Sequence, residues 1–162
     1  VKRPELMFEL AKLNSNVDFY VLGKSHFPKR NEYYTSKYGK MPNVYLMGHQ
    51  DGKIKEEILS KSWILLNTSF YECLPVSFLE ALAHGCALLS PRNPDDLTHK
   101  FGYYASSYDC TLEDLLHGLR YLISTGWWKD YGELGYNYVK ENHNTEIEVN
   151  RHINLYRRMI EG

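Results

Sequence analysis

The sequence lacks the cysteine, histidine and apolar patterns that mark several protein classes. It has three cysteines in 162 residues and no CxxC pair, which argues against a disulfide framework and a zinc site and fits a reducing compartment. Its seven histidines form no HxxxH or HExxH pattern. No run approaches the roughly 18 apolar residues of a membrane span. We therefore expect a cytoplasmic protein without a metal ion.

An excess of basic charge is also missing. Lys and Arg number 19 against 20 Asp and Glu, for a formal charge of −1. Nucleic-acid binding usually needs a basic surface, so nucleic acid is not an expected partner. Hydrophobic residues make up 43% of the chain, which is ordinary for a globular protein. The length and the lack of any linker predict one domain.

Helical patterns alternate with short apolar runs along the first half of the chain. Predicted strands cover 17–23, 43–48, 63–69 and 86–90. The first predicted helix begins at Pro4, and three further helices are predicted over 28–40, 53–61 and 75–84. After Pro91 we expect a loop over 93–106 with a short strand at 103–105, then helices over 111–124, 127–142 and 145–160. Uniformly apolar strands separated by helices predict an α/β fold, with a Rossmann-like doubly wound parallel sheet covered by helices on both faces.

Two glutamates, Glu72 and Glu80, interrupt the apolar stretch NTSFYECLPVSFLEALAHGCALLS (67–90). Pro75 favours a helix start and Gly85 a helix end, which puts Glu72 in the preceding loop and Glu80 roughly 7 Å along the helix axis from Pro75. The loop follows a buried strand, at the sheet edge where α/β folds bind ligands. A helix N-terminus attracts an anion such as a diphosphate. With the diphosphate there, Glu80 further along the helix would meet a ribose, and Glu72 ahead of the helix would meet the sugar on the other side of the diphosphate. A solvated helix residue and a plain loop charge fit the same geometry.

The stretch YECLPVSFLEALAHGCALLS resembles the E-x7-E signature of the group-1 glycosyltransferases, retaining enzymes of the GT-B fold. KRPELMFELAKL, VDFYVLGKS, NVYLMGHQDGKIKEEILSKS and NHNTEIEVNRHINLYRRMI extend the likeness over nearly the whole chain. The resemblance implies that 1–162 is the C-terminal, nucleotide-sugar (donor) binding domain of a hexosyltransferase-type enzyme of polysaccharide or glycan biosynthesis. It also implies an N-terminal acceptor domain and a first strand that this chain lacks.

The resemblance assigns roles residue by residue. It implies that Glu80 accepts hydrogen bonds from ribose hydroxyls and that Glu72, the catalytic-site glutamate, holds the donor sugar. The remaining donor-binding residues that it implies are the backbone N–H groups of Cys73, Leu74 and Val76, the phosphate lysine Lys2, and the base turn Gly48–His49. Cys73 stands where the family often has glycine, which disfavours a positive φ there. Neither a cofactor nor a metal is implied, because helix dipole and basic side chains offset the diphosphate charge.

The partners implied are the nucleotide-sugar donor and the missing N-terminal domain of the same polypeptide. Without that domain and the first strand, we expect no transferase activity, and an exposed apolar patch or self-association. For the basic residues Arg151, Arg157 and Arg158, one hypothesis is a peripheral membrane contact of the parent enzyme, and the other is a solvated face. Two alternative functions stay open: a non-catalytic nucleotide-binding subunit, and a sugar-nucleotide epimerase-like domain.

Overall fold

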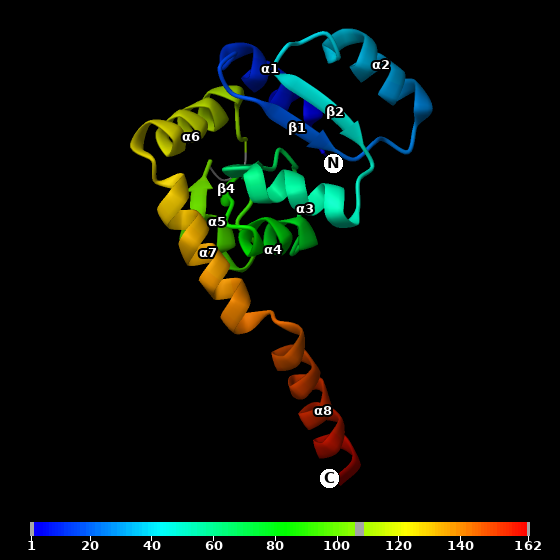
Figure 1. Cartoon of the computed structure of the whole chain (residues 1–162), viewed down its shortest axis with the longest axis vertical. Helices are drawn as coiled ribbons and strands as arrows, with labels where there is room; N and C mark the ends of the chain where they lie inside the picture. The colour runs from blue at the N-terminus through cyan, green and yellow to red at the C-terminus, as the bar shows by residue number, and fades with distance from the viewer. Residues whose placement is uncertain (1, 106–108, 162) are drawn as a thin grey trace.

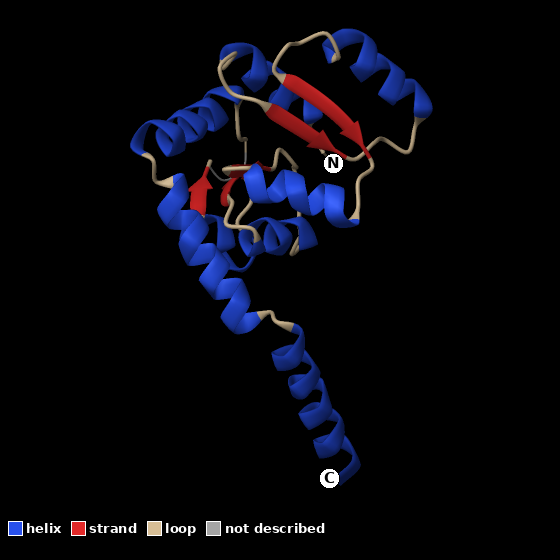
Figure 2. Cartoon of the chain, in the orientation of Figure 1, coloured by secondary structure: helices blue, strands red, loops and turns tan. Residues whose placement is uncertain are grey.

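The computed structural model describes residues 2–105 and 109–161, in which strands and helices alternate along the chain (Figures 1 and 2). The strands are β1 (Phe19–Leu22), β2 (Val44–Gly48), β3 (Ile64–Leu66), β4 (Ala87–Ser90) and β5 (Gly102–Tyr104). The helices are α1 (Pro4–Leu13), α2 (Pro28–Tyr38), α3 (Gly52–Lys61), α4 (Val76–Ala83), α5 (Leu97–Lys100), α6 (Leu112–Thr125), α7 (Trp128–Asn142) and α8 (Thr145–Glu161), with a 3₁₀ turn at Pro94–Asp96. The predicted order of elements is confirmed, and α5 is an addition within the predicted loop.

Every strand pair in the structure is parallel, as predicted. β1 pairs with β2, and β4 lies between β3 and β5. Within residues 2–105 and 109–161, no ladder joins the two groups, so the predicted sheet is present as a two-stranded and a three-stranded ladder. Parallel strands need helical crossovers, and helices α2, α3 and α4 make the connections between successive strands.

Helices cover both faces of the three-stranded ladder. Adjacent residues of β4 show this, because Leu88 and Leu89 are both fully buried but belong to different cores. Leu89 packs in a core that also contains side chains of α1, α2, α6, β1 and β2. Leu88 packs with Phe78 and Leu82 of α4. The first core spans both ladders, so the two groups of strands share one layer of helices.

The last helix, α8, projects away from the rest of the molecule at the end of α7 (Figure 1). All of its residues from 151 to 161 are exposed. Val149, Ile153, Tyr156 and Ile160 follow the spacing of one helix face and are exposed apolar side chains. Helix α8 therefore carries exposed apolar side chains. The apolar patch expected where a further domain and a first strand would pack, and self-association, stay predictions.

Capping side chains or a glycine mark both ends of α6 and the start of α8. Thr111 caps α6 in a reciprocal capping box with Asp114, and the Asn144 side chain accepts a hydrogen bond from the N–H of Ile147 at the start of α8. Gly126 ends α6 at φ +76°, and Trp127 precedes α7. The neighbouring Trp128 stacks on Trp63, with ring centroids 4.6 Å apart, while Trp127 is half exposed.

Candidate functional site

The loop between β3 and α4 carries the first glutamate of the motif. Asn67, Thr68 and Ser69 follow β3 and are buried polar residues. The Asn67 side chain accepts a 2.6 Å hydrogen bond from the Ser69 N–H, which closes a tight turn directly after the strand. The chain then reaches Glu72 at the carboxyl end of the parallel ladder, as predicted.

Glu72 is the more buried of the two glutamates, with a side chain 13% exposed. Its Oε1 accepts hydrogen bonds from Lys2 Nζ at 2.6 Å and from Asn67 Nδ2 at 3.1 Å. Burial alone would raise the pKa of Glu72, but hydrogen bonds from Lys2 and Asn67 outweigh it and lower that pKa below its usual value. The side chain is therefore an ionised acceptor at neutral pH. Two predicted site residues, Lys2 and Glu72, are in direct contact.

Helix α4 carries the second glutamate. The helix begins one residue later than predicted, so Pro75 immediately precedes it. The Pro75 carbonyl accepts a hydrogen bond from the Phe78 N–H at 2.9 Å. Gly85 follows the helix at φ +74°, a conformation that glycine adopts without strain. Phe78 and Leu82 are fully buried. These contacts fix α4 on the sheet, so Glu80 projects from a rigid element.

Glu80 lies at the border of the helix surface, with a side chain 36% exposed. Its Oε1 accepts a 2.7 Å hydrogen bond from Lys55 Nζ, on α3. This bond to Glu80 is the main cause of a raised pKa at Lys55, which stays a cation at neutral pH. Glu80 is thus a carboxylate with one oxygen held by a cation from a neighbouring helix.

The predicted base turn is the link between β2 and α3. Gly48 has φ +67°, where a side chain would be strained, and its carbonyl accepts a 2.6 Å hydrogen bond from the Gly23 N–H at the end of β1. His49 Nε2 lies 2.6 Å from Asp51 Oδ2, beside the start of α3. The turn therefore connects to Glu80 through α3 and Lys55, without a recorded direct contact between His49 and Glu80.

The backbone between the two glutamates faces solvent. Cys73, Leu74 and Val76 are exposed, and within the described part of the chain their N–H groups make no recorded hydrogen bond to protein. The only non-glycine residues with positive φ among the described residues are Asp95 and Asp96, so Cys73 has an ordinary backbone. Three N–H donors before and at the start of α4 are therefore open to a ligand.

Sequence reasoning missed three residues that shape the site: Lys55, Asn67 and Arg3. Arg3 Nε donates to the Thr68 carbonyl at 2.9 Å and its Nη1 to the Cys110 carbonyl at 3.1 Å, so it ties the start of α1 to the loop after β3. No local pattern marks these side chains. The partners of Lys55 and Arg3 lie 25 and 65 residues away along the chain, so only the fold reveals these two contacts.

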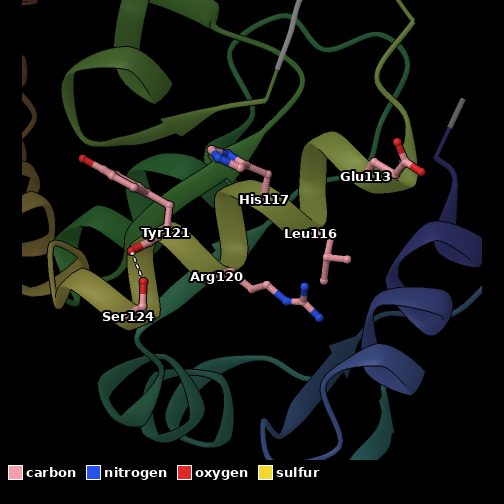
Figure 3. Close-up of a pocket in the computed structure, with 6 residues that line it drawn as sticks. All are labelled: Glu113, Leu116, His117, Arg120, Tyr121 and Ser124. Carbon is pink, nitrogen blue, oxygen red and sulfur yellow. Dashed lines mark hydrogen bonds between the residues drawn. The ribbon is translucent and has the colours of Figure 1, made fainter.

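A hollow on the outer face of α6 contains none of these residues. Figure 3 shows its lining, which comes from this helix alone: Glu113, Leu116, His117, Arg120, Tyr121 and Ser124. No group of three or more His, Cys, Asp or Glu suited to a metal ion occurs in residues 2–105 and 109–161. No helix within those ranges is long and apolar enough to cross a membrane. The carboxyl edge around Glu72 and Glu80 therefore remains the candidate site.

A sequence profile described as Glycosyl transferases group 1 matches residues 1–94, which include Lys2, the Gly48–His49 turn and both glutamates. The chain belongs to this family. Comparison with curated protein sequences gives no match. The predicted relationship to group-1 glycosyltransferases is confirmed.

Solved structures give the same fold for this group-1 chain. The pneumococcal O-GlcNAc transferase GtfA in complex with UDP and GlcNAc is 14% identical, with a TM-score of 0.80 over 99% of this chain and 34% of its own. Staphylococcus aureus TarM, in a complex that includes UDP, is 20% identical, with a TM-score of 0.75 over 96% of this chain and 33% of its own. The group-1 chain thus spans about a third of these proteins.

An epimerase shares the architecture too. The UDP-GlcNAc 2-epimerase from Neisseria meningitidis, bound to UDP-GlcNAc, is 18% identical, with a TM-score of 0.61 over 82% of this chain and 36% of its own. At such identities the likeness shows the fold alone. The GT-B C-terminal fold is confirmed, and the family match, rather than the fold, separates the group-1 chain from epimerases.

Proposed function

We propose that this chain is the donor-binding part of a glycosyltransferase that moves a sugar from a nucleoside diphosphate sugar to an acceptor with retention. The observation that carries the proposal is the pairing of each signature glutamate with a lysine, Glu72 in the loop after β3 and Glu80 on α4. Both carboxylates are held as acceptors, and the open N–H groups of the start of α4 lie between them in sequence. Hydroxyl-rich and anionic parts of one ligand match these groups.

The two carboxylates take different parts of the donor. Glu80, on the helix, accepts hydrogen bonds from the ribose hydroxyls, and Glu72, in the loop, accepts them from the sugar. The Gly48–His49 turn, joined to Glu80 through α3, lies against the base. Lys2 and the N–H groups of the loop hold the diphosphate, since cations and a helix N-terminus both favour it. Positive charge from these groups stabilises the leaving diphosphate without a metal.

Acceptor groups are proposed to come from residues outside this chain, because the chain spans about a third of GtfA and TarM. The chain alone should therefore bind the donor and transfer nothing. An assay with a labelled nucleotide-sugar and a panel of acceptors checks this. Robust transfer by the 162-residue protein would contradict the division of labour proposed between the two parts.

A thermal-shift panel of UDP-, GDP- and ADP-sugars tests donor binding. UDP-sugars come first, because UDP is present in the GtfA and TarM structures. A ligand at 100 times its Kd stabilises the folded state by about 2.7 kcal/mol, and the Tm of a domain this size rises by about 2–4 °C per kcal/mol. We expect a rise of about 5–10 °C for the matching base, which should disappear in Glu80→Ala. No shift with any base would refute the proposal.

The second candidate is an epimerase-like domain, which the fold shared with the meningococcal epimerase favours. It predicts conversion of a bound UDP-sugar into its epimer. Chromatography of UDP-GlcNAc after incubation with the protein tests this candidate: appearance of the epimer would favour it over the transferase proposal. A non-catalytic nucleotide-binding subunit, the third candidate, would bind the nucleoside diphosphate and its sugar-bearing form equally.

A further inference from the structure

Lys55 is the cation that contacts Glu80, and it comes from an element outside the signature motif. Its Nζ lies 2.7 Å from Glu80 Oε1, and the two side chains are 26% and 36% exposed. The other groups that influence its charge are Asp51 and Glu56 on or beside α3. The contact joins two helices, since Lys55 lies on α3 and Glu80 on α4.

This contact leaves the second carboxylate oxygen of Glu80 available to accept a hydrogen bond from a ligand. A carboxylate has two oxygens, and Lys55 occupies Oε1 of Glu80. Across residues 2–105 and 109–161, no hydrogen bond to Oε2 is recorded. One anchored oxygen restricts the rotation of the side chain, so the free oxygen keeps a defined direction. That is the geometry of an acceptor oriented before its ligand arrives.

We propose that Lys55 is a positioning residue for nucleotide recognition: it holds the Glu80 side chain in an orientation in which Oε2 accepts a hydrogen bond from a ribose hydroxyl. This inference rests on the proposed function, in which Glu80 takes the ribose. The fold adds a reason for the arrangement. Helix α3 begins at Gly52, a short way after the Gly48–His49 turn, so the helix that follows the proposed base contact also orients the proposed ribose contact.

The competing explanation is an ordinary surface ion pair, which contributes little and has no link to a ligand. A stability measurement alone does not separate the two. The discriminating quantity is the preference for a ribose hydroxyl, defined as the Kd of a 2′-deoxy or 3′-deoxy nucleoside diphosphate divided by the Kd of the ribose form. A surface ion pair leaves this ratio unchanged.

Titration calorimetry with UDP, 2′-deoxy-UDP and 3′-deoxy-UDP measures this ratio of Kd values. If the thermal-shift panel selects another base, the three nucleotides of that base take their place. Losing a hydrogen bond to a charged group weakens binding about 10- to 100-fold. The wild type should therefore show a Kd ratio in that range for at least one of the two ribose hydroxyls. Glu80→Ala should bring the ratio close to 1. Lys55→Met should lower it to a few-fold, and Lys55→Arg should restore most of it. Lys53→Met, an exposed lysine on the same helix, is the matched control and should leave the ratio unchanged.

Each other outcome overturns the inference. An unchanged ratio in Lys55→Met means that the pair is only a surface contact. Equal weakening of all three ligands means that Lys55 meets the phosphate or the base directly. Binding by the wild type with a ratio near 1 removes the ribose role of Glu80 but leaves donor binding intact. Failure to bind any nucleotide defeats the proposed function itself, and the inference with it.

Discussion

Glu72 and Glu80 are eight positions apart, and different forces fix them in place. Glu72 lies in a loop held by polar contacts to Lys2 and Asn67, close to a buried run of polar residues. Glu80 lies on a helix held by apolar side chains, and its carboxylate accepts a hydrogen bond from Lys55. Apolar burial is insensitive to pH and single polar deletions, whereas a polar loop depends on each hydrogen bond. The two halves of the motif should therefore respond to different mutations.

The largest effect should come from the apolar anchor of the helical half. Phe78 is fully buried beneath α4. Phe78→Ala should lower the free energy of unfolding by about 3–5 kcal/mol, because it removes buried apolar surface and leaves a cavity. Urea denaturation measures the loss. Val76→Ala is the control on the same helix: its side chain is 68% exposed, so we expect a change within about 0.5 kcal/mol. Equal losses at the two positions would contradict the view that the core holds the helix.

The second effect separates the two carboxylates by ligand. Glu80→Ala should weaken a nucleoside diphosphate and its sugar-bearing form alike, by about 1.5–3 kcal/mol, or about 10- to 100-fold. Glu72→Ala should leave the free diphosphate nearly unchanged and weaken the sugar-bearing form by a similar factor. Calorimetric titration of both variants with both ligands decides it. Equal losses for both ligands in both variants would show that the glutamates do not divide the donor between them.

A third, smaller effect tests the polar half directly. Asn67 donates to Glu72 and accepts from the Ser69 N–H. Asn67→Ala should cost about 1 kcal/mol of stability through the lost hydrogen bonds, and it should affect the sugar-bearing ligand more than the free diphosphate. Asn137→Ala, at an exposed position of α7, is the control for a surface asparagine. If Asn67→Ala binds both ligands as the wild type does, Glu72 does not need the loop turn for its orientation.

Much of the fold followed from the sequence, because its signals are local. The uniformly apolar run of β4 forms a strand that is buried on both faces, and Leu88 and Leu89 show the two-faced burial that a doubly wound sheet requires. Thr111 and Gly85 marked helix ends through backbone preferences that neighbouring residues set. The division of the strands into two ladders was not predicted, because ladder formation depends on how distant strands meet.

The site could be predicted only in part. The spacing of Glu72, Pro75 and Glu80 placed the two carboxylates correctly, in the loop and on the helix. The cations that hold them come from elsewhere in the chain. Lys2 was predicted as a phosphate contact, but its recorded partner is Glu72; Lys55 was not singled out at all. Pairings between side chains 70 and 25 residues apart depend on the packed helices and leave no local pattern.

The smallest effect concerns pH and the loop half alone. The folded-state pKa of Glu72 lies below its ordinary value, so its ionised form stabilises the protein above about pH 4.3, the usual pKa of an unfolded Glu, and this contribution is lost as pH falls through the folded pKa. Lys2→Met removes the cation, so the pKa of Glu72 should rise and the stability gained between acidic and neutral pH should shrink. Carbon NMR of the side-chain carboxyl follows the titration directly.

Lys12→Met is the matched control, because Lys12 pairs with a different glutamate, Glu9, and makes no ion pair with Glu72. It should leave the Glu72 titration unchanged. The expected rise in Lys2→Met is limited, since the Lys2 side chain is 73% exposed and water screens its charge. A Glu72 pKa that does not move would mean that Asn67 and the buried turn alone keep the carboxylate ionised. Lys2 would then be free to leave Glu72 when a diphosphate binds, and the loop half would depend on Asn67 as the helical half depends on Phe78.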